Sequence, residues 1–434
     1  MDHYSHHSMP SKLPPQLYIT IPEFILESGE TLINAVVAFT FHGLLNARGD
    51  NAVVVCHALS GSAAVEEWWP SLMNGPNPVL DPSKYCIICC NSLGSPYGSS
   101  SPLTYRDGNK KVKECYGPIF PKTTIRDDVR AHKYVLDILG VKSVQCVIGP
   151  SMGGMVALEW SFFGTGYVRA LVLIATAARQ CGWQIAWNEN QRNTILCDAK
   201  FRNGWYGDDP PLAGLAAARM AALMTYRSQY SFKQRFGRRT KAASVIQAAT
   251  RLITDEVQLV NGSTSPVDSE SVSSIEAKNG EQDPAKGIFS AQSYLRYHGD
   301  KFNARFDANC YIHILDKMDT HDITRGRCAS DVPEDEALER VLGRIRQPTL
   351  VVGIPSDGLY PIQEQQILYE AIPNAVFGII ESREGHDAFL IETAQLNDLV
   401  RTFFDRRTVL ELEDKVQACL DIKRDAIVVW AGSF

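Results

Sequence analysis

Ser151 stands in a pattern that is typical of reactive serines on tight turns. The stretch Gly149–Gly153 reads GPSMG and fits G-x-S-x-G; it follows the apolar run Val144–Ile148 and precedes a helix-like segment, residues 155–163. A serine on a sharp strand-to-helix turn needs small neighbours, because the turn is strained and tightly packed. The start of the helix would also present backbone N–H groups that stabilise a developing oxyanion. The context predicts a nucleophilic serine; the alternative is a glycine-rich turn with an idle serine.

Two further residues have the types and the chain order that such a nucleophile needs, a base to take its proton and a carboxylate to orient the base. Asp357 lies three residues after the apolar run Thr349–Ile354, and His386 lies six residues after Val376–Ile380. Of the ten histidines, only His386 follows both Ser151 and Asp357. The order serine, aspartate, histidine is that of the α/β-hydrolase fold. We therefore expect a triad; the alternatives are a turn-forming aspartate and a surface histidine.

His57 is the rival base, because it also ends an apolar run, but it precedes the serine in the chain. It heads the segment His57–Gly61, which lies after an early strand, where the oxyanion loop of this fold belongs. We expect the backbone N–H groups of Leu59 and Met152 to form the oxyanion hole. The side chains of these two residues would be structural only.

The elements that must hold these residues appear as short apolar runs with helix-like segments between them. Near-continuous apolar runs are typical of strands covered on both faces, and their alternation with helices indicates a mostly parallel sheet. The sequence therefore predicts the α/β class and an α/β-hydrolase fold. The runs are Ala52–Cys56, Tyr85–Cys90, Val144–Ile148, Ala170–Ala175, Thr349–Ile354 and Val376–Ile380.

A helical insertion interrupts this alternation. It is rich in Ala, Arg, Gln and Met, with a helical pattern at Leu212–Tyr226. Within it, residues 261–286 are dense in Ser, Asp, Glu, Gly and Asn, a composition typical of a disordered loop. The expected organisation is an N-terminal extension at 1–20, core at 21–180, a helical lid at 181–326, core at 327–407 and a C-terminal tail at 408–434.

Composition argues against several classes of protein. The 434 residues carry a formal net charge of −6 and are 45% hydrophobic, which is ordinary for a globular protein. The mild acidity argues against a nucleic-acid partner, and no apolar stretch approaches the ~18 residues of a membrane span. The eleven cysteines are scattered, without paired C-x-x-C motifs, so we expect no metal and a reducing, cytoplasmic location.

Many separate stretches, in order from about Ile21 to Phe404, resemble the homoserine O-acetyltransferase family, and its fungal members most. They include CHALSGSA at Cys56–Ala63, GPSMGGMVALEW at Gly149–Trp160, LMTYRS at Leu223–Ser228, FSAQSYLRYHGDKF at Phe289–Phe302, FDANCYI at Phe306–Ile312, SDGLYP at Ser356–Pro361 and EGHDAFL at Glu384–Leu390. So many segments in one order are more specific than any single motif.

The resemblance implies acetyl transfer from acetyl-CoA to the hydroxyl of L-homoserine, with acetyl-CoA as a cosubstrate and no permanently bound cofactor. It supports Ser151, Asp357 and His386 as the triad of a ping-pong mechanism under a lid. It also implies that Arg227 binds the carboxylate of the substrate and Asp387 its ammonium. By themselves these two would be a surface helix arginine and a helix N-cap. A homodimer is expected from the resemblance alone.

Several alternatives stay open at this point. Residues 38–43 read AFTFHG where the family has a sequence close to AYKTWG, Pro150 stands where glycine is usual, and the tail after Arg407 is additional. A secondary-metabolite hydroxyl could therefore be the acceptor, since the deacetylcephalosporin C acetyltransferases share the motifs. Ester hydrolysis uses the same triad, and the acyl donor could be acetyl or succinyl. A non-catalytic binding protein would show a broken triad.

Overall fold

An eight-stranded, mostly parallel sheet forms the centre of the molecule. The structure, a computed structural model, describes residues 15–108, 114–242 and 287–407. The strand order is β1-β2-β4-β3-β5-β6-β9-β10; β2 runs antiparallel to both of its neighbours, and all other pairs are parallel. The strands are β1 Leu17–Ile25, β2 Thr31–His42, β3 Ala52–Val55, β4 Cys86–Cys90, β5 Val144–Pro150, β6 Leu171–Ile174, β9 Thr349–Gly353 and β10 Ala375–Ile379.

The six predicted apolar runs correspond to strands β3, β4, β5, β6, β9 and β10, which are neighbours in the sheet. Every residue of β3, β4, β6 and β9 is buried, because helices cover both faces of the sheet. Successive side chains point to opposite faces, so Val53 and Val54 belong to two different hydrophobic clusters. Helices α3, α4, α11 and α12 contribute to one cluster, and α2 with the helical residues 393–407 to the other.

The helices that cover the sheet are mostly short, and α3 has a clear N-terminal cap. Helix α3 begins with a capping box, in which the hydroxyl of Thr124 accepts the Asp127 N–H and the Asp127 carboxylate accepts the Thr124 N–H. The bounds are α1 Val65–Trp68, α2 Pro70–Asn74, α3 Ile125–Ile138, α4 Met152–Trp160, α11 Glu334–Leu342, α12 Ile362–Ala371 and α13 Ala388–Ile391, with short 3₁₀ turns at Arg106–Gly108, Gly117–Ile119, Ser161–Phe163 and Arg202–Gly204.

Strands β1 and β2 extend the sheet beyond the six predicted runs. Strand β1 begins at Leu17, within the expected extension at 1–20, so the sheet starts four residues before the expected core boundary. It is an edge strand that mixes buried and exposed positions, with Ile21 buried and Ile25 61% exposed. A half-exposed strand does not produce a continuous apolar run, which is why the sequence did not reveal it.

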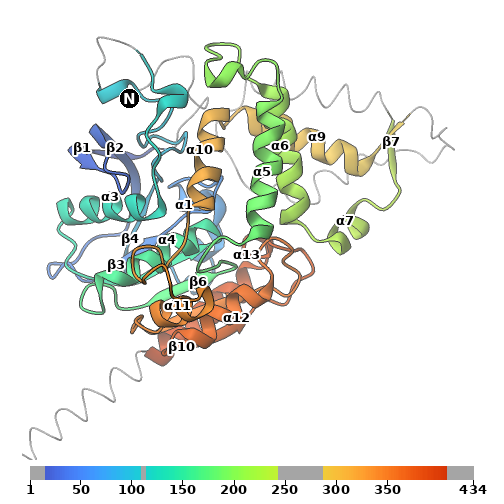
Figure 1. Cartoon of the computed structure of the whole chain (residues 1–434). Coiled ribbons are helices and arrows are strands. Elements are labelled where there is room, and N and C mark those ends of the chain that lie inside the picture. Colours follow the sequence, from blue (N-terminus) through green and yellow to red (C-terminus); the bar gives the residue numbers. More distant parts are fainter. Residues whose placement is uncertain (1–14, 109–113, 243–286, 408–434) are drawn as a thin grey trace, which may run out of the picture.

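A mainly helical insertion separates β6 from β9. Its helices are α5 Gly182–Leu196, α6 Leu212–Tyr226, α7 Gln229–Arg235, α9 Ser290–Asn303 and α10 Ala308–Asp319. Helices α5, α6 and α9 pack side by side (Figure 1), and α6 has the bounds of the predicted helical pattern. The antiparallel ribbon of β7 (Thr240–Ala242) and β8 (Gly287–Phe289) was not predicted.

The insertion leaves and rejoins the core at one place. The Gln180 N–H donates to His321 O, and the Ile323 N–H donates to Ala178 O, each at 3.0 Å. These contacts lie close to the expected lid bounds of 181 and 326. The predicted polar loop 261–286 and the tail 408–434 lie outside the described residues. Within the described residues, no helix combines the length and apolarity needed to cross a membrane.

Candidate active site

Ser151 occupies a strained turn between β5 and α4. Its backbone has φ 55° and ψ −125°, a region that side-chain-bearing residues rarely adopt. Two contacts hold it there: the Ser151 N–H donates to Ile174 O at 2.9 Å, and the Thr176 hydroxyl donates to Ser151 O at 2.7 Å. The serine is only 5% exposed. The backbone is therefore strained at the residue that presents this side chain, as expected of a nucleophile.

Three glycines make this turn geometrically feasible. A Cβ on Gly149 would lie 2.1 Å from the carbonyl oxygen of Gly153, and a Cβ on Gly153 would lie 2.1 Å from that of Cys56. A Cβ on Gly154 would lie 2.5 Å from the Cβ of Thr176. The predicted need for small neighbours thus has a specific cause. The start of α4 packs directly on the backbone at the end of β3, where the predicted oxyanion loop begins.

The structure brings Asp357 and His386 together. The Nδ1 of His386 lies 2.6 Å from Oδ2 of Asp357, and both side chains are buried. Burial alone would lower the pKa of His386, but the charge and hydrogen bond of Asp357, together with the charge of Asp387, more than offset this and raise it. Strands β5, β9 and β10 are parallel members of one sheet. The turns that carry Ser151, Asp357 and His386 therefore all lie beyond the C-terminal ends of these strands.

Aromatic rings surround His386. The His386 ring lies 5.3 Å from Phe389, 5.4 Å from Tyr360 and 6.0 Å from Tyr226, measured between centroids. Tyr226 is the last residue of α6, so the helical insertion reaches His386 itself. Gly385 has φ +83°, and a Cβ there would lie 2.6 Å from the Ser228 nitrogen. The histidine loop and the end of α6 therefore pack backbone against backbone.

The two predicted oxyanion donors have amides that suit the role. Met152 is the first residue of α4, and the first N–H groups of a helix have no carbonyl partner within it. Leu59 lies in the loop after β3, the segment against which Gly153 packs. Within the described part of the chain, neither N–H donates a hydrogen bond.

Arg227 and Asp387, far apart in sequence, are neighbours in the structure. The Nε of Arg227 lies 3.0 Å from Oδ2 of Asp387, an ion pair without hydrogen-bond alignment. The Nη1 of Arg227 donates to Glu384 at 2.5 Å. The Asp387 N–H donates to Tyr226 O at 3.0 Å and ties the two segments together. Sequence reasoning missed Glu384 as a partner, because nothing in a local pattern reveals which distant arginine a carboxylate meets.

A group of cations from the helical insertion lies near Tyr226 and Phe302. The Arg219 guanidinium lies 5.3 Å from the ring centre of Tyr226 and 4.9 Å from that of Phe302, and Arg305 lies 5.3 Å from Phe302. Burial and the charges of Arg219, Lys301, Arg227 and Arg305 lower the pKa of His298 to about 4. Among the described residues, no carboxylate forms an ion pair with Arg219, Lys301 or Arg305, and the buried Nη1 of Arg219 has no hydrogen-bond partner.

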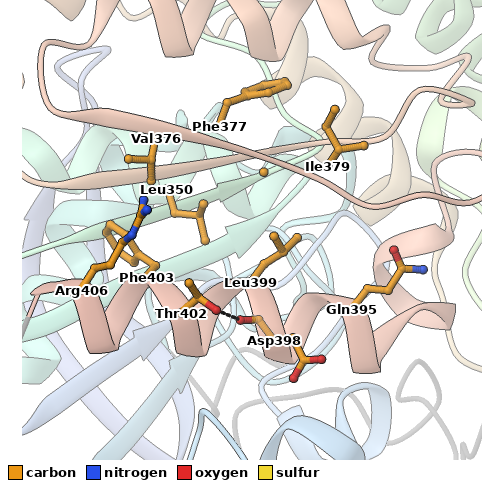
Figure 2. A pocket seen from close by; sticks show the side chains of 11 residues that line it. Leu350, Val376, Phe377, Ile379, Gln395, Asp398, Leu399, Thr402, Phe403 and Arg406 are labelled. Carbon is orange, nitrogen blue, oxygen red and sulfur yellow. Dashed lines mark hydrogen bonds between the residues drawn. The ribbon is translucent and has the colours of Figure 1, made fainter.

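A pocket elsewhere on the molecule does not include these residues. Figure 2 shows a pocket of about 390 Å³ between the edge strand β10 and the helical residues 393–407. Phe377 and Ile379 line it from the strand, and Leu399 and Phe403 from the helix. It lies on the outer edge of the sheet, so we assign it no part in the chemistry of Ser151.

The chain resembles known proteins along most of its length. The family described as alpha/beta hydrolase fold matches residues 51–393. A homoserine O-acetyltransferase of Emericella nidulans is 48% identical over 426 residues, which cover 90% of this chain and 86% of that protein. The homoserine O-acetyltransferase of Saccharomyces cerevisiae is 45% identical over 430 residues, which cover 89% of this chain and 86% of that protein.

A solved structure supports the architecture independently. The crystal structure of esterase E22 matches with a TM-score of 0.70 at 22% identity, and the match covers 90% of this chain and 99% of that one. This likeness shows the fold alone. The fold, the pairing of His386 with Asp357 and the extent of identity to the fungal enzymes agree, and the chain therefore belongs to the homoserine O-acetyltransferase family of the α/β-hydrolase fold.

Proposed function

We propose that this protein transfers an acetyl group from acetyl-CoA to the hydroxyl of L-homoserine and forms O-acetyl-L-homoserine. The observation that carries the proposal is the identity of 48% and 45%, over about nine-tenths of the chain, to two homoserine O-acetyltransferases. The strained Ser151 and the 2.6 Å pair of His386 with Asp357 supply the chemistry that such a transfer needs.

In the first half-reaction His386 takes the proton of Ser151, and the serine oxygen attacks the thioester carbon. Negative charge develops on the thioester oxygen, where the N–H groups of Leu59 and Met152 would stabilise it. The carbon–sulfur bond then breaks, and the protonated His386 returns its proton to the leaving sulfur. The products of this half-reaction are acetyl-Ser151 and free coenzyme A.

In the second half-reaction His386 takes the proton of the homoserine hydroxyl, whose oxygen attacks the acetyl carbon. The bond to Ser151 breaks, and the serine recovers its proton from His386. Water would compete for the same intermediate. The rings of Tyr226, Tyr360 and Phe389 around His386 form the apolar surroundings that oppose such hydrolysis.

The contact between Arg227 and Asp387 suits an amino-acid acceptor. The carboxylate and ammonium of homoserine share one carbon atom, so a cation and an anion that adjoin each other match them. Arg227 would receive the carboxylate and Asp387 the ammonium, through charge-assisted hydrogen bonds. Glu384 holds the guanidinium from its other side through Nη1. We infer that Glu384 orients Arg227 and does not itself contact substrate.

The donor is inferred to be a coenzyme A thioester, because the cations Arg219, Lys301 and Arg305 lack ion-pair partners among the described residues. The phosphate groups of coenzyme A would supply the missing negative charge. The family supports acetyl as the acyl group; succinyl-CoA is the donor to test beside it.

The deciding experiment measures thiol release from acetyl-CoA by the purified protein, with and without L-homoserine, beside Ser151→Ala. Release that requires homoserine and is lost in the variant supports the proposal. A single stoichiometric burst without turnover would mean that the acceptor is another hydroxyl. Steady release without homoserine would indicate hydrolysis, and release from succinyl-CoA in place of acetyl-CoA would correct the donor.

We further infer a homodimer, on the family resemblance, and a cytoplasmic location. The buried cysteines Cys56, Cys89, Cys90 and Cys146 are free thiols, which suits a reducing compartment. Light scattering coupled to size-exclusion chromatography tests the dimer, since a monomer of 48.1 kDa would elute with half the expected mass. Fractionation of cells that express the protein tests the compartment.

A further inference from the structure

His57, the rival base by sequence, makes two hydrogen bonds that give it a different role. His57 is 2% exposed and lies two residues after the end of β3. The Ser92 N–H lies 3.1 Å from Nε2, and the carbonyl oxygen of Ala58 lies 2.8 Å from Nδ1. A backbone N–H can only donate, so Nε2 must be the acceptor. The ring proton of the neutral form therefore sits on Nδ1 and is donated to Ala58 O.

The carbonyl of Ala58 and the N–H of Leu59 belong to one peptide unit. That unit is planar and trans, so its C=O and N–H point in opposite directions. Ala58 O also accepts the Gly61 N–H at 2.9 Å. Two donors on this oxygen leave the peptide little freedom to rotate. The direction of the Leu59 N–H is thus determined by what holds the Ala58 carbonyl.

On the Nε2 side, the partner of His57 is the Ser92 N–H, whose neighbouring residue is held in place by a buried ion pair. The residue after Ser92 is Leu93, whose N–H donates to Oδ1 of Asp128 at 2.9 Å and whose carbonyl accepts from Nζ of Lys317 at 2.7 Å. Lys317 and Asp128 pair at 2.7 Å with both side chains fully buried. A buried ion pair that holds both polar groups of Leu93 fixes the position of the neighbouring Ser92 N–H.

We propose that His57 is a positioning residue that directs the Leu59 N–H toward the oxyanion of the Ser151 reaction. Its Nδ1–H holds the Ala58 carbonyl, and its Nε2 is itself held by the Ser92 N–H. This inference rests on the proposed function only in that Ser151 forms an acyl-enzyme. Burial lowers the pKa of His57 to about 4, so the neutral ring persists at any ordinary assay pH. The histidine therefore acts through hydrogen bonds and not as a base.

Two amide substitutions separate the two contacts. In His57→Asn the side-chain nitrogen takes the place of Nδ1 and still donates to Ala58 O. In His57→Gln the longer amide reaches the place of Nε2 and can accept from the Ser92 N–H, but nothing remains at Nδ1. His321→Gln is the matched control, because His321 is also buried and neutral but lies where the insertion rejoins the core, and its carbonyl accepts the Gln180 N–H.

The readout is the rate at which Ser151 is acetylated by acetyl-CoA and, separately, by p-nitrophenyl acetate, a generic acyl donor. We expect His57→Gln to lower both rates roughly 10²–10³-fold, the size of losing one oxyanion donor, with apparent KM values within about threefold of wild type. His57→Asn should stay within about tenfold of wild type, and His321→Gln should change neither rate by more than about threefold.

Equal loss in the Asn and Gln variants, or an unchanged rate in His57→Gln, would overturn the inference. If a variant fails to fold, ¹⁵N NMR of the wild-type protein still decides, because the inference requires a proton on Nδ1 and none on Nε2 of His57. Failure of the proposed function would appear differently. Wild type would then ignore homoserine, while the dependence of p-nitrophenyl acetate turnover on His57 would remain measurable.

Discussion

The carboxylate of Asp357 divides its two oxygens between the backbone and the base. Oδ1 accepts the N–H groups of Leu359 at 2.8 Å and Tyr360 at 2.9 Å, and Oδ2 holds His386. Asp357→Asn keeps an acceptor for the backbone but presents an amide to Nδ1, which favours the wrong tautomer. We expect kcat to fall roughly 10³–10⁴-fold with the fold intact.

The same variant has a pH signature. In wild type the charge of Asp357 raises the pKa of His386, so the acid limb of kcat/KM should lie above the ordinary pKa of histidine. Without that charge the limb should move to lower pH in Asp357→Asn. A pH profile of kcat/KM for both proteins measures this. An unmoved limb, or a kcat within tenfold of wild type, would contradict the assigned role.

Asp387 gives a second test at this scale. Asp387→Asn removes the charge that is proposed to meet the ammonium of homoserine and should raise the KM for homoserine roughly 10–100-fold. The rate of Ser151 acetylation should change little, because that step does not involve the acceptor. Glu384→Gln is the matched control, since Glu384 touches Arg227 but not the substrate, and its effect on KM should be smaller. A larger effect in Glu384→Gln would reverse the two roles.

Single residues were predictable where chain order constrains them. Ser151, Asp357 and His386 were predicted from the G-x-S-x-G motif and from the chain order serine, aspartate, histidine. In the structure all three follow the C-terminal ends of parallel strands. The contacts of Glu384 and His57 were not predictable. Each depends on a segment that only the fold brings near: Arg227 at the end of α6 for Glu384, and the Ser92 amide after β4 for His57.

Among the strands, those buried on both faces were the ones that the sequence predicted. Strand β4 reads CIICC and is buried throughout, so it was visible as an apolar run. Strand β1 pairs only with β2 and exposes much of its length, so it was not. The ribbon of β7 and β8 has three residues in each strand, which is too short to show a period against helical surroundings.

The junction between β5 and α4 yields a prediction about stability. Gly153→Ala would place a methyl group 2.1 Å from the backbone oxygen of Cys56, which no side-chain rotation can relieve. We expect a loss of about 1–3 kcal/mol in the free energy of unfolding and a displaced serine turn. Gly182→Ala is the control, because a Cβ there meets nothing within 4 Å. Urea denaturation of both variants measures the difference, and equal stability would show that the junction yields.

For the whole molecule, the break in alternating runs predicted a helical lid at 181–326, and the structure has a mainly helical insertion between β6 and β9. The two ends of the insertion meet through Gln180 with His321 and Ala178 with Ile323. How the insertion meets His386 was not predictable. The ring of Tyr226 against His386 joins the end of α6 to a loop 160 residues later, and no local pattern encodes that contact.

Buried neutral histidines spread through the core lead to a prediction about acid stability. Burial lowers the pKa of His57 and His321 to about 4 and that of His132 to about 3. Unfolded histidines titrate near 6.5, so below that pH the unfolded chain binds more protons and the folded state loses stability. Burial also lowers the pKa of His298 to about 4 and that of His313 well below the ordinary value. The raised pKa of His386 has the opposite effect, because it favours the folded state in acid, but it is one group against five.

We therefore expect the free energy of unfolding to fall steadily as the pH drops from about 6.5 towards 4, by up to roughly 1.4 kcal/mol per pH unit for each buried histidine. Urea midpoints at several pH values measure the slope. Carboxylates contribute in the same range, so the discriminating variant is His321→Asn, which removes one histidine and should flatten the slope by about one such increment. If the slope of His321→Asn equals that of wild type, carboxylate titration alone explains the acid lability, and the histidines are not its source.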